Sequence, residues 1–196
     1  SLNLGLKGIP EIAETSILAR NLEILEYTNG KIHFPFISCE KSLNMIRKAK
    51  KNGLNVTCGV SIAHLYYTED SLISYNSNFK IFPPLRTKKD REALRKGLLD
   101  GTIDLVSSMH EQINIENKKV EFSRAIEGSI GLESFFGILN NIFTLEKTIS
   151  FLTNGKNLFK IKNSKLEIGE KACLTMFCHD TINKFNEKDI KSKSKN

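Results

Sequence analysis

Imidazole and carboxylate groups can bind metal ions and move protons, and a few side chains in this sequence are candidates for such chemistry. The polar candidates are His33, His64, Arg86, His110 and Glu111. His110 and Glu111 are adjacent, and adjacent strand residues point to opposite faces, so Glu111 would replace a neighbouring ligand only in a distorted loop. Ser107, Ser108 and His110 also lie close together. The chain lacks a nucleophile elbow and an orienting third residue, which argues against serine hydrolysis.

The elements that must position these side chains alternate between helix and strand, a pattern typical of parallel β/α units. Helices are predicted from Pro10 to the stop at Asn29 and Gly30, and at residues 40–52, 88–99, 131–140 and 145–152. Strands are predicted at residues 31–37, 54–60 and 102–106. After residue 154 the pattern changes to short alternating segments, and strands at 157–161 and 171–177 would form a small β appendage.

Length and composition are those of a water-soluble globular chain. It has 196 residues, of which 40% are hydrophobic, enough for one substantial core. No stretch approaches the roughly 20 apolar residues of a membrane span, and the first residues lack the pattern of a signal peptide. We therefore expect no membrane association and a cytoplasmic location. Four cysteines without a C-x-x-C pair are expected to be reduced.

The net charge of +7 raises the question of a nucleic-acid partner. The basic residues form two helical sets, near residues 47–51 and 88–96, and a tail at residues 188–195. Asp90 and Glu92 interrupt the second set, as in a solvated helix. No aromatic stacking platform accompanies these charges, so no nucleic-acid partner is expected.

Residues 67–112 carry the most informative motifs of the chain. They contain YTED, SYNSNFKIFPPLR, DREAL, GLLDGTID and SSMHEQ. These runs resemble the L-T-E-D, Y-D-T-N-x-K-V-N-P-P-L-R, D-R-E-A-L, G-L-x-D-G-T-I-D and T-D-H-A-P-H motifs of dihydroorotases, members of the amidohydrolase superfamily. Blocks at residues 5–14, 31–38, 49–58, 127–134 and 191–196 match further motifs of that family in the same order. The resemblance covers nearly the whole chain.

The resemblance implies a fold. Dihydroorotases have a (β/α)₈ barrel with a small β-sandwich, and a complete barrel needs about 250 residues. About four β/α units are predicted here, so we expect the C-terminal part of a barrel at residues 1–153 and part of a β-sandwich, with a basic tail, at residues 154–196. Such a part would leave strand edges unpaired. A missing N-terminal half-barrel, or a second copy of the chain, is the expected partner.

The resemblance also implies a site, because the family uses zinc to activate a hydroxide. Phe36 stands at the position of a metal-binding histidine, and Met109 at that of the aspartate that binds metal and transfers the proton. Phe82 replaces a substrate-contacting asparagine, and Ile113 replaces the last histidine of its motif. Gly59 stands at a glutamate position of the family. We expect no catalytic residues, no bound zinc or other cofactor, and an apolar remnant pocket formed by Phe36, Phe82, Met109 and Ile113.

Three functions follow as hypotheses. The first is a catalytically inactive, dihydroorotase-like structural subunit of pyrimidine biosynthesis, for which the resemblance suggests aspartate carbamoyltransferase as a partner. The second is a residual zinc-dependent amidohydrolase that uses His33, His110 and Glu111. The third is a small-molecule binding module that uses the apolar pocket. His64 and Arg86 are expected to have structural roles, in packing or capping and in an ion pair.

Overall fold

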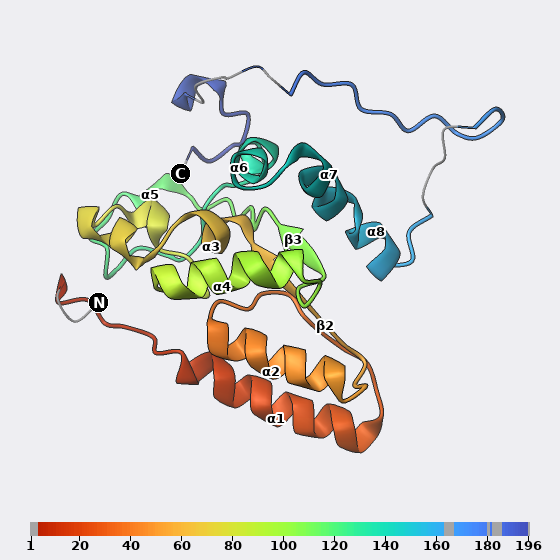
Figure 1. Ribbon diagram of the computed structural model, residues 1–196. Coiled ribbons are helices and arrows are strands. Elements are labelled where there is room, and N and C mark those ends of the chain that lie inside the picture. The colour runs from red at the N-terminus through yellow and green to blue at the C-terminus, as the bar shows by residue number, and fades with distance from the viewer. Residues whose placement is uncertain (1–3, 163–166, 180, 182–185, 196) are drawn as a thin grey trace.

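The computed structural model describes residues 4–162, 167–179, 181 and 186–195. Its centre is a sheet of three parallel strands, in the order β1 (Ile32–Phe34), β2 (Val56–Ser61) and β3 (Leu105–Ser107). Ile32 is paired with Val56, and Gly59 is paired with Leu105. All three strands match predicted ones. Helix α2 connects β1 to β2, and α3 and α4 lie between β2 and β3, which is the β/α arrangement that the sequence predicts (Figure 1).

Eight α-helices and three 3₁₀ turns lie in the described residues. The α-helices are α1 (Ile12–Thr28), α2 (Glu40–Lys51), α3 (Ile62–Tyr66), α4 (Lys88–Leu99), α5 (Ile115–Lys118), α6 (Phe135–Ile142), α7 (Leu145–Thr153) and α8 (Gly155–Leu158). The 3₁₀ turns are η2 (Glu69–Ser74), η3 (Ser77–Phe79) and η4 (Glu187–Asp189). Helices α1, α2 and α4 pack in succession, α1 on α2 and α2 on α4 (Figure 1).

Local sequence explains where the long helices begin and end. Helix α1 ends at Asn29, which has the left-handed backbone (φ 49°) that asparagine tolerates. Helix α4 begins after Thr87, whose hydroxyl accepts from the Asp90 amide while the Asp90 carboxylate accepts from the Thr87 amide. This capping box satisfies two amides that lack helical partners. Both boundaries confirm the sequence predictions.

The core lies between the sheet and the helices α1, α2 and α4. Leu43 and Ile46 of α2, Cys58 and Val60 of β2, and Leu94 and Leu98 of α4 are all buried there. Helix α4 approaches α2 at Gly97, where a β-carbon would lie 2.7 Å from a methyl of Leu43. The apolar sides of α2 and α4 are thus buried against the core, and their other sides face solvent.

The C-terminal region differs from the prediction. The segment predicted as a strand at 157–161 is instead helix α8 and the turn after it. Residues 171–178 form no ladder with any strand of the described chain, and Leu174 and Met176 are exposed. Alternating apolar residues form a strand only when a neighbouring strand supplies hydrogen bonds and one face is covered. The predicted β-sandwich portion is therefore absent from the described part of residues 154–196.

In the described residues the sheet has three strands, and α1 precedes β1 and packs on α2, as expected for part of a β/α barrel. No helix within the described residues has the length and apolar composition needed to cross a bilayer. Cys39 and Cys58 are buried thiols, whereas Cys173 and Cys178 are exposed.

Candidate functional site

The carboxyl ends of the three strands meet on one side of the sheet, where parallel β/α folds place their sites. A cavity of about 480 Å³ opens beside the residues that follow β2 and β3. Its wall includes the tyrosines Tyr66 and Tyr67 and the amides Asn76 and Asn78. Ser108, Ser129 and Ser134 add hydroxyls, and Ala63, Phe79, Met109 and Ile138 add apolar surface. This wall is neutral apart from Lys195.

Met109 follows β3 and closes the inner wall of this cavity. Its side chain is 6% exposed and packs with Ile81 and Leu85 in a small apolar cluster, which Phe36 and Phe79 extend. Its backbone has φ 46°, in the left-handed region that side chains other than glycine seldom adopt. The Met109 amide donates to the Ser107 hydroxyl at 3.1 Å. The residue is therefore held by both packing and backbone contacts, within a cluster of apolar side chains.

The four residues predicted to share one remnant pocket are divided in the structure. Phe36 packs against the Met109 cluster and also lines a second, apolar cavity of about 330 Å³ next to α1. Phe82 lines this second cavity as well, and 60% of its surface is exposed. Ile113 lies against Gly128, where a β-carbon would be 2.8 Å from its side chain, and lines neither cavity. Phe36 therefore lines the second cavity and packs against the apolar cluster that borders the first.

Gly59 on β2 occupies a position where no side chain fits. A β-carbon there would lie 2.5 Å from the Pro35 carbonyl oxygen and 2.8 Å from a methyl of Leu105. Contacts of that length do not occur between real side chains and backbone. The space that a strand-borne ligand would need beside β1 and β3 is filled by the chain itself.

His64 is a fully buried structural residue. Its ring contacts the carbonyl oxygens of Pro83 and Pro84 through Nε2, at 3.1 and 3.2 Å. Carbonyls only accept, so Nε2 carries the proton and Nδ1 accepts from the Ser61 hydroxyl at 2.7 Å. Desolvation lowers the pKa of His64 to about 4. The ring joins the end of β2 to the Pro-Pro loop and has no free nitrogen for a metal.

His33 lies on β1, away from the strand ends. Its Nδ1 contacts the Thr57 hydroxyl on β2 at 2.9 Å, and its ring packs edge to face on Phe159 at 6.0 Å. Burial lowers the pKa of His33, and the nearby Asp104 opposes that shift. The residue bridges the sheet and the segment after α8.

His110 follows Met109 after β3 and accepts hydrogen bonds from the chain before α6. The amides of Gly131 and Leu132 donate to its Nδ1 at 3.3 and 3.2 Å. Helix α6 begins at Phe135, four residues later than predicted. Glu111 is exposed, and its amide donates to the Ser129 carbonyl.

Zinc does not fit the residues that the structure brings together. Phe36 carries no lone pair to donate, Gly59 has no side chain, and the thioether of Met109 is a weak ligand for this ion. Nowhere in the described residues do three or more histidine, cysteine, aspartate or glutamate side chains gather closely enough to hold a metal. The two candidate histidines of an amidohydrolase reading, His33 and His110, belong to separate hydrogen-bonding networks.

Arg86 is held in a largely buried network with Glu14 and Ser38. Its Nη2 lies 3.9 Å from the Glu14 carboxylate, its Nε donates to the Ser38 hydroxyl at 2.9 Å, and its Nη1 donates to the Ile9 carbonyl at 2.6 Å. The amide and hydroxyl of Ser38 both donate to Glu14. The network joins α1 to the segments after β1 and before α4.

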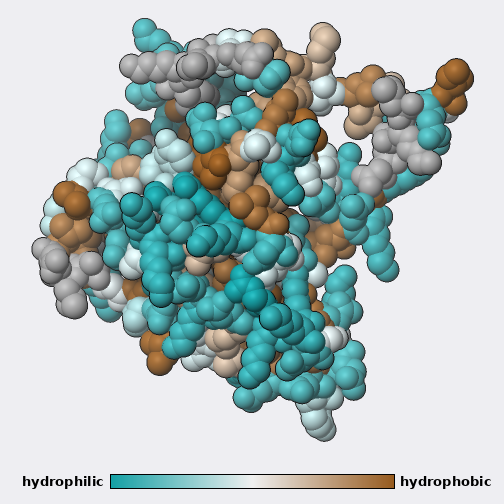
Figure 2. Space-filling view, viewed as in Figure 1, coloured by the Kyte–Doolittle hydropathy of each residue, from teal (hydrophilic) through white to brown (hydrophobic). Residues whose placement is uncertain are grey.

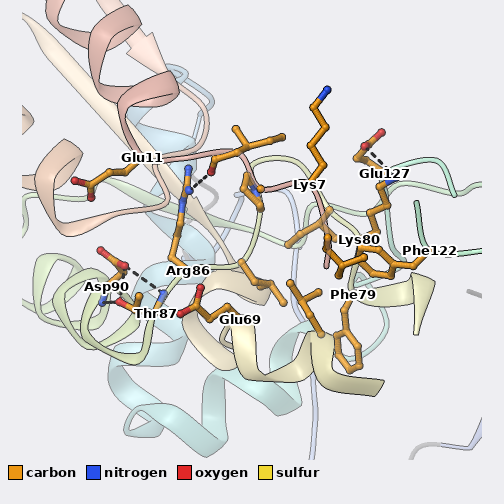
Figure 3. A pocket seen from close by; sticks show the side chains of 17 residues that line it. Lys7, Glu11, Glu69, Phe79, Lys80, Arg86, Thr87, Asp90, Phe122 and Glu127 are labelled. Atoms are coloured by element: carbon orange, nitrogen blue, oxygen red, sulfur yellow. Dashed lines mark hydrogen bonds and ion pairs between the residues drawn. The ribbon is translucent and has the colours of Figure 1, made fainter. Parts of the chain in front are cut away.

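Arg86 also forms part of the wall of a third cavity, of about 350 Å³ (Figure 3). Its walls come from residues 6–11, 79–87 and 122–127, with Glu69 and Asp90 beside them. The charged groups include an ion pair between Lys80 and Glu127 at 3.7 Å. Arg86 points to Ile9, away from the Lys80 and Glu127 side of the cavity (Figure 3).

Lys118 is a buried amine that no sequence pattern singles out. Only 1% of the surface of Lys118 is exposed. Its Nζ donates to the Ser77 carbonyl at 2.7 Å and more weakly to the Lys80 carbonyl at 3.4 Å. Burial lowers its pKa to about 8, against the opposing charge of Glu127. It stands in the polar run ENKKVE, so only the packing of loops distant in sequence reveals it.

Solved structures place the fold in a class. The L-hydantoinase (dihydropyrimidinase) from Arthrobacter aurescens superposes with a TM-score of 0.73 and 23% identity, covering 82% of this chain and 38% of that one. A dihydroorotase from Saccharomyces cerevisiae in complex with 5-fluoroorotic acid gives a TM-score of 0.65 and 19% identity, over 80% of this chain and 47% of that one. The fold is therefore that of part of the (β/α) barrel that these structures share.

Sequence comparison gives the family. A dihydroorotase from Caldanaerobacter subterraneus is 36% identical over 98% of this chain and 46% of its own length. One from Shouchella clausii is 38% identical over 88% of this chain and 42% of its own length. No family model matches the sequence. The chain belongs with the dihydroorotases by descent and spans less than half the length of these relatives.

Proposed function

We propose that this chain is a dihydroorotase-like protein of pyrimidine biosynthesis that acts as a structural subunit and does not catalyse hydrolysis alone. The observation that carries the proposal is the burial of Met109 at the end of β3, packed with Ile81, Leu85 and Phe36. A carboxylate or imidazole would be desolvated in that cluster without a partner, which is costly. Apolar side chains in the same place add to the core.

Zinc content and turnover test this proposal. The purified chain is expected to contain no stoichiometric zinc and to leave dihydroorotate unchanged across pH 6 to 9. The Met109→Asp variant restores a potential metal ligand. It is still expected to bind no stoichiometric zinc and to leave dihydroorotate unchanged, since Phe36 and Gly59 supply no metal-ligating atoms. Zinc at one equivalent per chain together with dihydroorotate turnover would overturn the proposal and favour the residual amidohydrolase.

A structural subunit needs something to assemble with. Strand β1 is paired on one edge with β2, and on its other edge no described strand adds a ladder. Helix α1 exposes three isoleucines, Ile12, Ile17 and Ile24, and Ile17 also lines the apolar cavity next to this helix. Such an edge and surface favour association with further β/α units. The occupant we propose is an N-terminal half-barrel, from a separate or longer chain, or a second copy of this chain.

Oligomeric state and partner binding are separable measurements. Sedimentation of the chain at micromolar concentration is expected to show self-association, or a complex when an N-terminal half-barrel is added. A monomer that unfolds cooperatively without either would contradict this part of the proposal. Aspartate carbamoyltransferase is the proposed enzyme partner, and co-elution of the two purified proteins on gel filtration tests it. Separate elution at concentrations of tens of micromolar would exclude that partner.

A second candidate function is binding of a small molecule in the cavity beside Met109. The amides of Asn76 and Asn78 and the rings of Tyr67 and Phe79 offer hydrogen bonds and flat apolar surface, the combination that small-molecule sites use. A ligand that binds only the native state raises the melting temperature. A thermal-shift screen of pyrimidine precursors tests this, with Asn78→Leu as the variant that is expected to abolish any shift.

A further inference from the structure

The net charge of the chain is concentrated on two adjacent helices. Helices α2 and α4 carry ten lysines and arginines and three acidic residues, a formal charge of +7. The whole chain has 29 basic and 22 acidic residues and the same formal charge. The remaining residues are therefore balanced, with nineteen of each sign. A field of one sign over one face is the condition for electrostatic steering of a partner.

These two helices pack against one another and present the charge as one surface. Their apolar sides are buried in the core through Leu43, Ile46, Leu94 and Leu98. Seen from the side of α2 and α4, hydrophilic side chains cover this part of the molecule (Figure 2). Two shallow hollows follow the junction of the helices, of about 650 and 290 Å³, and Asn44 and Lys89 line both.

Part of the positive charge on this surface is neutralised within the chain. Arg47 pairs with Asp100 at 2.8 Å, Lys50 with Asp104 at 2.7 Å, and Lys89 with Glu40 at 2.6 Å. Four exposed lysines take part in no ion pair with a described residue, and they are Lys48, Lys51, Lys88 and Lys96. Lys48 borders the larger hollow and Lys96 the smaller.

We infer that the α2–α4 surface is a docking site for an acidic segment of a partner protein. Complementary charge is the observation that selects this occupant, because the exposed lysines without an ion pair to a described residue offer partners for aspartate and glutamate side chains. Glu11, Glu40 and Asp90 also line the larger hollow, and Glu40 and Glu92 the smaller, so the excess positive charge lies on the unpaired lysines of the surface rather than inside the hollows. Neither helix has an aromatic residue on which a base could stack. A membrane surface is disfavoured, since the apolar sides of both helices face the core.

The test compares two triple variants of the full chain with the same change in net charge. The first triple variant reverses three charges on the docking surface, with Lys48→Glu, Lys88→Glu and Lys96→Glu. Lys31→Glu, Lys119→Glu and Lys147→Glu reverse exposed lysines elsewhere. Binding of fluorescent poly-L-glutamate is followed by anisotropy from 50 to 300 mM salt, with single-stranded and duplex DNA of equal charge as competing probes. Circular dichroism confirms that both variants fold.

The wild-type chain is expected to bind poly-L-glutamate more tightly than either DNA at equal charge. The docking-surface triple is expected to weaken poly-L-glutamate binding by about tenfold or more at 50 mM salt, and the control triple by less than about threefold. Equal losses in the two triples would show that net charge alone acts and would overturn the inference. Absence of binding to poly-L-glutamate would also overturn it. Tighter binding of DNA would replace it with a nucleic-acid surface.

Discussion

Lys118 and Ser77 bind each other in both directions. The ammonium group of Lys118 donates to the Ser77 carbonyl at 2.7 Å, and the Ser77 hydroxyl donates to the Lys118 carbonyl at 2.6 Å. The pair ties η3 to α5, two short segments that lie 41 residues apart in sequence. Glu127, Lys80 and Glu111 are the charged groups that influence the amine, and desolvation outweighs them.

Lys118 predicts a rise of stability at high pH. Its pKa is about 8 in the folded chain and about 10.5 when unfolded. Between these values the unfolded chain binds more protons, so the free energy of unfolding increases with pH. The gain is complete above pH 10.5 and is lost as pH falls through 8. Lys118→Met is expected to lack this rise in urea unfolding measured from pH 7 to 11.

The effect of Lys118 must be measured as a difference between the wild type and the variant, because Cys58 changes the free energy of unfolding with pH in the opposite direction. Burial raises the pKa of that thiol to about 12, so folding loses stability as pH rises from about 9. Subtracting the Lys118→Met curve from that of the wild type removes this shared contribution. Lys119→Met, at an exposed neighbour, is the control and is expected to follow the wild type. Parallel curves for wild type and Lys118→Met would contradict the assigned burial.

His64 predicts a loss of stability in mild acid. Its pKa is about 4 in the folded chain, below the value of 6.5 for a free imidazole. Its contribution is complete above pH 6.5 and is lost as pH falls toward 4, because the unfolded chain takes up the proton first. His64→Gln is expected to be less stable at pH 7 by roughly 1–3 kcal/mol. It is also expected to lose the wild-type dependence between pH 4 and 6.5.

Chemical denaturation at pH 4.5, 5.5 and 7 measures both effects of His64→Gln. His179→Gln changes an exposed histidine and serves as the control. If the variant at position 64 keeps the acid sensitivity of the wild type, the buried and neutral state assigned to His64 is wrong.

The sequence predicts the central fold well because periodic burial determines it. The apolar positions of α2 and α4 recur at helical spacing, and Thr87 and Asn29 mark helix ends by their own chemistry. The segment at 171–177 has the alternation of a strand as well, yet it forms no ladder in the described chain. A strand depends on a partner that lies elsewhere, and no local pattern reports whether that partner exists.

The candidate site shows a similar division. Chemistry at Phe36 and Met109 is readable from residue type, since neither side chain is a good ligand for zinc. Their position is not, because Phe36 packs against the apolar cluster of Met109 while lining a different cavity together with Phe82. No local sequence pattern marks Lys118 as buried, because its burial arises only when residues 77–80, distant in sequence, pack on α5.

Alanine is expected to destabilise the chain at Gly59 and to stabilise it at Gly137. Gly59→Ala would place a methyl 2.5 Å from the Pro35 carbonyl, and overpacking of this kind costs roughly 1–3 kcal/mol. Gly137 lies inside α6 with open space around its α-carbon. Gly137→Ala is expected to be stabilising by about 0.5–1 kcal/mol, from helix propensity.

Thermal and urea unfolding of these two alanine variants decide the point. Equal effects at both glycines would mean that the sheet relaxes around position 59, and that a side chain at this strand position is tolerated.

The ion pair of Arg86 and Glu14 predicts strong energetic coupling. Both side chains are largely buried, with 12% and 15% exposure. Arg86→Met leaves the Glu14 carboxylate without its cation and is expected to cost about 3–5 kcal/mol. Glu14→Gln keeps an acceptor for the Ser38 amide and is expected to cost less. The double variant is expected to be more stable than the sum of the single changes implies, by about 1–3 kcal/mol.

A double-mutant cycle with Ser38→Ala separates the ion pair from the hydroxyl that both charged groups contact. Ser38 donates to Glu14 and accepts from Arg86, so part of the coupling could pass through it. If the ion pair itself carries the coupling, the term between Arg86 and Glu14 persists in the Ser38→Ala background. If the term vanishes there, the serine hydroxyl is the bridge. In that case the 3.9 Å separation of the two charges contributes little directly, as expected when charges exceed hydrogen-bonding distance.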